Sequence, residues 1–324
     1  MNKEVIFKLH SLYRDNFRIT GYKFGKGNKS VCIIGAMRGN EVQQLYTCSQ
    51  LINELKKLEK KGAITRNNEI LIIPCINTYG MNIGKRFCTT DNVDINRMFS
   101  ETEYVGTSRK IAEGIFEKVQ GYTYGIQFAS FYMQGTFIPH VRMMETGYQN
   151  PSLANLFGLK YVLIRKPTPS DTATLNYNWQ MGSTNAFSVY TNSTDKIDEK
   201  SAKHAVVAVL RFLTRMGIIK YNCHNGYISS VINEEILKSL ISETSGIYRR
   251  LKNPGDSVER GEILGEVLDP YEGKAISQII SSTDGIIFFA HTSPLVMENE
   301  VVYKIIRRIH EWFQEYFKIL HIEN

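Results

Sequence analysis

The sequence predicts an α/β fold in which helices sandwich a mainly parallel sheet, followed by a β-rich unit. Three observations predict it. Short, continuous apolar runs alternate with amphipathic helical stretches over the first two-thirds of the 324 residues. Runs without polar alternation are typical of strands buried on both faces. Beyond residue 223, short β-type runs are separated by turns. We therefore expect two domains, at residues 1–223 and 224–324.

Five apolar runs are expected to form the buried strands of the first domain. The first two, Val31–Gly35 and Ile70–Ile76, contain no charged residue. The other three are Tyr124–Phe128, Tyr161–Ile164 and Ala186–Tyr190. Sites in open α/β sheets lie at the carboxyl ends of the strands. The segments that follow these runs are therefore the places to look for function.

Three stretches are predicted to be helices that cover this sheet. Apolar residues recur at helical spacing from Leu45 to Leu58, and a Lys-Gly pair then ends the pattern. Similar periodicity marks Ser108–Val119 and Glu199–Met216. Each stretch has one apolar face, as expected of a helix that packs on a sheet.

The sequence changes character near Gly226. Turn-rich segments such as Lys252–Gly261 and Ser282–Gly285 separate short β-type runs up to about residue 304, which predicts a compact all-β unit. A last amphipathic helix is expected at roughly Tyr303–Leu320. Its Trp and Phe stripe favours core packing or a contact between copies of the chain in a homo-oligomer.

The formal net charge of +7 is compatible with a small anionic ligand. It does not indicate a nucleic-acid surface, because Lys and Arg are scattered along the chain. The densest cluster, at 56–61, alternates Lys with Leu and Glu and is typical of a solvated helix face.

Five widely spaced cysteines without a Cys-x-x-Cys pair argue against a disulfide framework and against a cysteine zinc site. The N-terminus has no signal-peptide core, and no apolar run approaches the roughly 20 residues of a membrane helix. We therefore expect a cytoplasmic protein with no membrane partner.

Two segments at the predicted strand ends resemble motifs of the succinylglutamate desuccinylase/aspartoacylase family of the zinc carboxypeptidase superfamily. Gly35–Glu41 stands where the family has His-Gly-x-Glu, whose His and Glu bind zinc. Arg86-Phe followed by Asp94–Phe99 resembles the family's Arg-Phe and Asp-x-Asn-Arg-x-Phe. The resemblance implies that Asn96 and Arg97 grip a substrate carboxylate.

Two further segments and the C-terminal unit extend the resemblance over nearly the whole chain. Tyr124–Ser130 matches the strand that ends in Asp-x-His and supplies the third zinc ligand, and Ala186–Tyr190 matches the strand that carries the catalytic Glu. The β-rich region resembles the family's barrel-like C-terminal domain. The resemblance thus implies a zinc-carboxypeptidase-like sheet with an amide hydrolase site.

The residues at the metal positions depart from the family. Arg38 replaces the first His, Ala129 replaces the second, and Tyr190 stands at the position of the general base. Zinc hydrolases need three protein ligands and a metal-bound water. From this set only Glu41 is retained as a metal ligand, with His140 as a candidate replacement. The sequence leaves zinc, and any other cofactor, open.

The anion-binding side of the motif is retained. Arg86, Asn96 and Arg97, with Arg38 added, would give one pocket several donors for a carboxylate. Glu41 is a candidate ion-pair partner for Arg38.

Two functions fit these residues. One is the binding of a carboxylate-bearing N-acyl amino acid or small peptide, with or without hydrolysis of its amide bond. The other is that of a non-catalytic pseudoenzyme that binds an anionic ligand or a protein partner.

Overall fold

The computed structural model describes residues 1–10, 15–101, 103–131 and 133–308. The chain forms two compact units. Unit 1 holds Met1–Ser130 and Pro139–Ile232, and unit 2 holds Phe131–Ile138 and the residues that follow Ile232. The units differ from the division expected at residue 223, because residues 131–138 join the second unit and residues 224–232 stay with the first.

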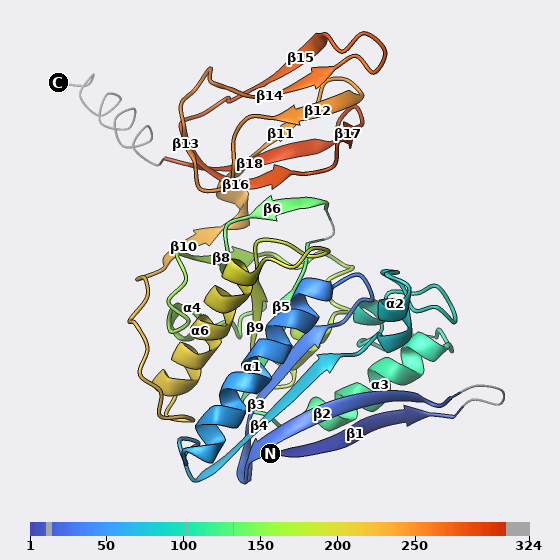
Figure 1. The fold of residues 1–324 in the computed structure, drawn as a ribbon, viewed down its shortest axis with the longest axis vertical. Helices are drawn as coiled ribbons and strands as arrows, with labels where there is room; N and C mark the ends of the chain where they lie inside the picture. The colour runs from blue at the N-terminus through green and yellow to red at the C-terminus, as the bar shows by residue number, and fades with distance from the viewer. Residues whose placement is uncertain (11–14, 102, 132, 309–324) are drawn as a thin grey trace. The chain divides into compact units, whose positions relative to one another are not determined.

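Unit 1 is built on a nine-stranded sheet with the order β1-β2-β4-β3-β5-β9-β7-β8-β10 (Figure 1). The strands are β1 (Asn2–Leu9), β2 (Phe17–Gly25), β3 (Gly27–Ala36), β4 (Asn67–Cys75), β5 (Tyr124–Ala129), β7 (His140–Met144), β8 (Tyr161–Arg165), β9 (Asn185–Tyr190) and β10 (Ser230–Asn233). All five predicted strands of this sheet are present as β3, β4, β5, β8 and β9.

The sheet is mixed, so the expectation of a mainly parallel sheet is corrected. The pairs β3–β4, β3–β5, β5–β9 and β7–β8 are parallel. The pairs β1–β2, β2–β4 and β7–β9 are antiparallel. The strands β1, β2 and β7 were not predicted, because polar residues interrupt their apolar ones.

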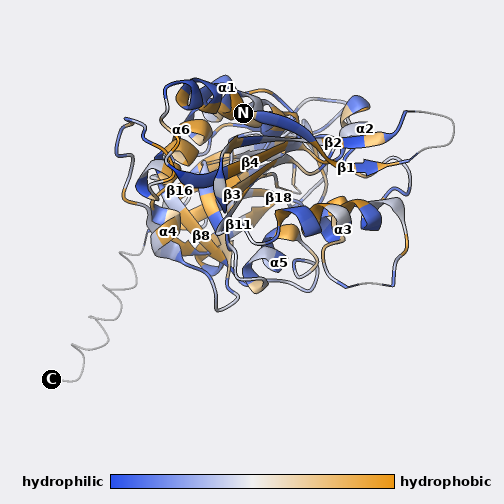
Figure 2. Ribbon diagram, turned by 90° about the horizontal axis from the view of Figure 1, so that it is seen from below, coloured by the Kyte–Doolittle hydropathy of each residue, from blue (hydrophilic) through white to orange (hydrophobic). Residues whose placement is uncertain are grey.

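Helices cover both faces of the sheet. The helices α1 (Val42–Lys60) and α6 (Glu199–Arg215) pack over one core, which includes Leu51, Phe187 and Phe212. On the other face, α3 (Thr107–Val119) and α5 (Leu175–Met181) enclose a second core. Figure 2 shows hydrophobic residues along the strands, whereas the helices carry both hydrophilic and hydrophobic residues. Short helices α2 (Thr78–Asn82), α4 (Pro151–Asn155) and η1 (Ile95–Arg97) lie in the connections.

Unit 2 is all-β apart from one short 3-10 turn, η2 (Glu234–Ile236), among its described residues. One sheet has the order β11-β18-β16-β13, with β6 paired to β16, and the other has the order β15-β14-β12-β17. The strands are β6 (Gly135–Phe137), β11 (Leu237–Ile241), β12 (Gly246–Arg250), β13 (Ser257–Val258), β14 (Ile263–Leu268), β15 (Ala275–Ile280), β16 (Gly285–His291), β17 (Leu295–Val296) and β18 (Val301–Arg307).

The predicted terminal helix begins in the wrong place. Residues 303–307 belong to β18, where Val and Ile side chains favour a strand. The rest of that prediction, from residue 309, lies outside the described residues. None of the described helices is both long and apolar enough to span a membrane.

The aromatic core under α6 gives a direct test of this packing. Phe212 is fully buried, stacks on Phe157 at 4.4 Å between ring centroids and meets Phe187 at 5.3 Å. Phe212→Ala should lower the free energy of unfolding by about 3–5 kcal/mol, because the cavity it leaves is enclosed by other rings. Urea unfolding measures the loss. Tyr148→Ala, which removes a ring that is 66% exposed, should cost less than about 0.5 kcal/mol, and equal losses would contradict this core.

Candidate functional site

The strand registers place Ala129, Tyr190 and His140 side by side across three neighbouring strands of the sheet. Tyr190 on β9 pairs with Ala129 on β5 and with His140 on β7. Paired residues of neighbouring strands point to the same face of a sheet. The rings of Tyr190 and His140 stack at 4.7 Å with an interplanar angle of 4°. The guanidinium of Arg142, two residues further along β7, lies 4.6 Å from the Tyr190 ring centroid.

Glu41, at the start of α1, is completely buried and saturated with hydrogen-bond donors. Its Oε1 accepts from Arg38 Nη1 at 3.1 Å and from the hydroxyl of Ser130. Its Oε2 accepts from the backbone N–H groups of Met37 at 2.8 Å and Arg38 at 3.0 Å. Because Ser130 directly follows Ala129, these bonds bring the end of β5 beside the loop that follows β3.

Asp94 joins this loop to the segment that carries the anion-binding motif. Its Oδ2 accepts from Arg38 Nε at 2.9 Å and from Arg86 Nη2 at 3.3 Å. Its Oδ1 accepts from the backbone N–H of Asn96 at 3.0 Å and so caps the η1 turn. One buried carboxylate therefore connects three of the predicted ligand-binding residues.

The pKa values of the two arginines on Asp94 are shifted in opposite directions. Burial disfavours the charged form of Arg38, but Glu41 and Asp94 more than offset this, so the pKa of Arg38 is raised above its ordinary value. Burial and the neighbouring Arg38 lower the pKa of Arg86, although Asp94 and Glu41 oppose the shift. Arg38 is therefore a fixed cation at any pH at which the fold survives.

The side chains of Asn96 and Arg97 bond outside this network, and Arg97 reaches a second acidic group, Asp171. The Oδ1 of Asn96 accepts from the backbone N–H of Leu175 at 3.3 Å. The side chain of Arg97, which is 30% exposed, donates to the backbone carbonyl of Ser170 and reaches Asp171 Oδ1 at 3.4 Å. The other oxygen of Asp171 faces Arg165 Nη2 at 3.5 Å.

The predicted site residues thus fall into linked groups. Arg38, Arg86 and Asn96 meet on Asp94, Arg97 meets Asp171, and Tyr190 stacks on His140. The charges of Arg38, Glu41, Arg142 and Arg165 all act on the Tyr190 hydroxyl, which shows that the groups are electrostatically connected.

Sequence reasoning missed Ser130, Arg142, Arg165 and Asp171. Ser130 lay within a recognised segment, and its position after Ala129 was the available signal. Arg142 lies on the unpredicted strand β7, and Asp171 lies in a Pro-rich connection without periodicity. No local pattern identifies either of them.

Tyr190 is held in its protonated form. Burial raises the pKa of its hydroxyl, and the neighbouring Arg142, Arg38 and Arg165 only partly oppose the shift. A phenol in this state donates a hydrogen bond but does not take a proton from water near neutral pH. The residue at the expected base position is therefore poorly suited to that role.

The described side chains do not fit zinc. Each oxygen of Glu41 already accepts two hydrogen bonds, Arg38 places a cation 3.1 Å from Oε1, and Ala129 has no donor atom. Within the described part of the chain, no group of three or more His, Cys, Asp and Glu residues could hold a metal ion. His140 lies in the row of Tyr190, and its role as a replacement ligand stays a prediction.

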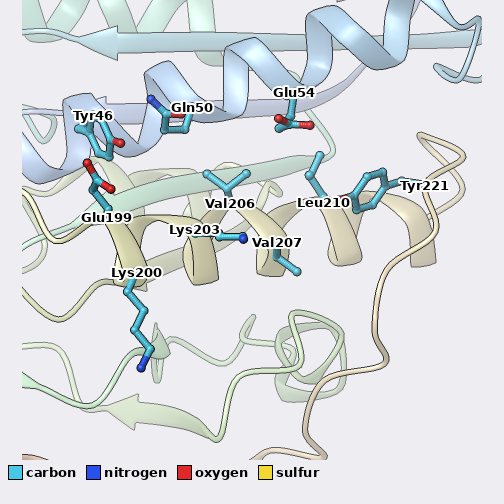
Figure 3. Close-up of a pocket in the computed structure, with 10 residues that line it drawn as sticks. All are labelled: Tyr46, Gln50, Glu54, Glu199, Lys200, Lys203, Val206, Val207, Leu210 and Tyr221. Atoms are coloured by element: carbon cyan, nitrogen blue, oxygen red, sulfur yellow. The ribbon is translucent and has the colours of Figure 1, made fainter.

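A separate hollow of about 670 Å³ lies on the outer surface of α1 and α6 (Figure 3). It mixes charged, aromatic and aliphatic side chains, among them Tyr46, Glu54, Lys203 and Tyr221. None of the site residues predicted from the sequence lines it, so it gives no support to their proposed roles.

Comparisons with known proteins agree with the motifs and the fold. Residues 27–126 match the family described as the succinylglutamate desuccinylase/aspartoacylase catalytic domain. A search of curated proteins finds no match.

Three solved structures share the fold at low sequence identity. A succinylglutamate desuccinylase from Silicibacter sp. TM1040 has 15% identity and a TM-score of 0.78, over 94% of this chain and 95% of that chain. The ectoine utilization protein EutE (DoeB) from Ruegeria pomeroyi, solved with product bound, has 16% identity and a TM-score of 0.74 over 90% of each chain. An aspartoacylase family protein from Mesorhizobium loti has 17% identity and a TM-score of 0.73 over 95% of each chain.

Asp171 gives a pH-dependent test of the second acidic group. Burial opposes ionisation of this carboxyl, but hydrogen bonds from Thr168 and the charges of Arg165 and Arg142 prevail and lower its pKa. A lowered pKa in the folded state stabilises the protein above the ordinary carboxyl pKa, and this stability is lost as the pH falls through the folded value. Asp171→Asn should therefore reduce stability at neutral pH and flatten its decline with acid.

Urea unfolding from about pH 7 to about pH 2.5 measures this difference. Asp195→Asn, which changes an exposed carboxylate, should leave the pH dependence as in the wild type. An unchanged acid limb in Asp171→Asn would show that the carboxylate is not held by these partners.

Proposed function

We propose that the chain, whose residues 27–126 match the succinylglutamate desuccinylase/aspartoacylase catalytic domain, binds a carboxylate-bearing N-acyl amino acid or small peptide. The ligand is small and anionic, and the binding takes place in the cytoplasm without nucleic acid or membrane. Arg97 and Asn96 hold the ligand's carboxylate, and Arg86 adds positive charge beside them.

The observation that carries this proposal is the partly exposed side chain of Arg97 in a cluster of arginines around Asp171. Arg97 and Arg165 form ion pairs with the two oxygens of Asp171, and Arg142 acts on the same carboxyl. Arginine side chains gathered at one point favour the approach of an anion. The Arg97 guanidinium reaches solvent and can donate hydrogen bonds to a ligand carboxylate.

The orientation of Asn96 supports the same role. Its carbonyl oxygen already accepts from Leu175. The amide NH2 end is therefore the end that can donate to a ligand oxygen. Asp94 holds the backbone of Asn96 and the Leu175 N–H holds its side chain before the ligand arrives, which lowers the entropic cost of binding.

We further propose that the chain binds this ligand without cleaving it by the family's zinc mechanism. Hydrolysis through zinc needs a metal-bound water and a base that takes its proton. The guanidinium of Arg38 and the protonated hydroxyl of Tyr190 stand in those places, and neither performs the step. The pseudoenzyme alternative is thus the form of the function that the site supports best.

Ligand binding is tested by calorimetry with N-acetyl and N-succinyl derivatives of aspartate and glutamate. Arg97→Ala should weaken binding of the best ligand by about tenfold or more, because a hydrogen bond to a charged group contributes about 1.5–3 kcal/mol. Arg66→Ala removes an exposed arginine elsewhere in unit 1 and should bind as the wild type does. Equal affinity of the two variants would contradict the assignment, and no binding at all by the wild type would favour a protein partner instead.

The absence of zinc-dependent cleavage is tested by mass spectrometry of the same compounds. After prolonged incubation with the protein and added zinc, the N-acyl compounds should remain intact at the level of a protein-free control. Release of free amino acid that depends on the protein, and that Tyr190→Phe abolishes, would show that the chain is an enzyme.

A further inference from the structure

Two of the three positions that match the family's zinc ligands, 38 and 41, are joined in this chain by an ion pair. Glu41 accepts from Arg38 at 3.1 Å and from Ser130, which directly follows Ala129. Positions 38, 41 and 129 are therefore neighbours in space, as a shared ligand would require. The group that bridges the loop after β3 and the η1 segment is the side chain of Arg38.

We propose that Arg38 is a built-in cation that replaces the structural contribution of a metal ion and positions the ligand-binding residues through Asp94. It forms ion pairs with Glu41 on one side and with Asp94 on the other. Arg38 is thus a positioning residue, and the affinity part of this inference rests on the proposed function.

The path from Arg38 to the ligand-binding residues consists of two hydrogen bonds. Arg38 Nε donates to Asp94 Oδ2 at 2.9 Å, and the other Asp94 oxygen accepts from the backbone N–H of Asn96 at 3.0 Å. The η1 turn has only three residues, so this cap largely fixes its orientation. The turn ends with Arg97, and any shift of Asp94 therefore moves both proposed ligand contacts.

Burial makes this arrangement depend on a cation. Glu41 is fully buried and Asp94 is 9% exposed. A buried carboxylate that loses its partner is strongly destabilising, because neither water nor another charge replaces the lost bonds. Without Arg38, Arg86 would remain as a cation on Asp94, and Glu41 would keep neutral donors such as the Met37 N–H and the Ser130 hydroxyl.

The same contacts exclude a divalent ion. A metal on either oxygen of Glu41 would compete with two hydrogen-bond donors and lie close to a permanent positive charge. Like charges a few ångströms apart repel strongly in a shielded site. We therefore expect the stability and the ligand affinity of the wild type to be insensitive to chelators and to added zinc.

Chemical rescue separates the positioning role from general stability. Arg38→Ala should lower the melting temperature and weaken ligand binding by about tenfold or more, through loss of two charge-assisted hydrogen bonds. Guanidinium ion at low, non-denaturing concentration should restore part of both, whereas sodium at equal ionic strength should not. Arg66→Ala is the control, and it should lose little and gain nothing from guanidinium.

Rescue of the melting temperature needs no ligand and remains informative if the proposed function fails. Should Arg38→Ala not fold, Arg38→Lys keeps the charge without the planar fork and should bind ligand more weakly at near-normal stability. Wild-type affinity in Arg38→Lys, or identical behaviour of Arg38→Ala with guanidinium and with sodium, would overturn the inference.

Reconstruction of the metal site provides an independent test. Arg38→His combined with Ala129→His should bind zinc, measured by elemental analysis after dialysis, and its melting temperature should fall on chelation. Ala129→His alone keeps the guanidinium and should carry no zinc. Stoichiometric zinc in the wild type or in this single variant would contradict the exclusion by Arg38.

Discussion

The candidate site depends on one buried guanidinium held between two buried carboxylates. Arg38 joins Glu41, at the start of α1, to Asp94, at the cap of η1. Ionised side chains are costly to bury unless each is paired and its hydrogen bonds are met. Here the pairing ties together segments far apart in sequence, so the position of each depends on the others. One hydrogen-bond network therefore connects the loop after β3, the 86–97 segment and the end of β5.

The sheet explains why this network meets Tyr190. Continuous apolar side chains bury β3, β5 and β9 on both faces, and their registers bring their carboxyl ends to one edge. On β9, Phe187 and Val189 point into the core under α1 and α6, so Tyr190 points to the opposite face. The antiparallel strand β7 then adds His140 and Arg142 on that same face. The aromatic and cationic environment of Tyr190 is thus a consequence of strand register.

Sequence alone predicted the parts whose signals are local. The strands β3, β4, β5, β8 and β9 are continuous apolar runs, and the long helices have clear amphipathic spacing. The strands β1, β2 and β7 lack that signal, and residues 303–307 were assigned to a helix because Ile residues fit both periods. The motif residues were likewise visible, whereas Asp171 and Arg142 reach the site only through tertiary contacts that no spacing encodes.

An arginine at a position that matches a metal ligand of the family would change what the site can do. A metal ion offers open coordination positions to water and substrate, and a guanidinium offers only hydrogen bonds. In this chain the Nε and Nη1 of Arg38 are directed to the protein's own carboxylates. Its charge is therefore used internally, whereas Arg97, beside Asp171, reaches solvent. Under the proposed function, recognition of an anion and activation of water, which a metal would combine at one point, are separated.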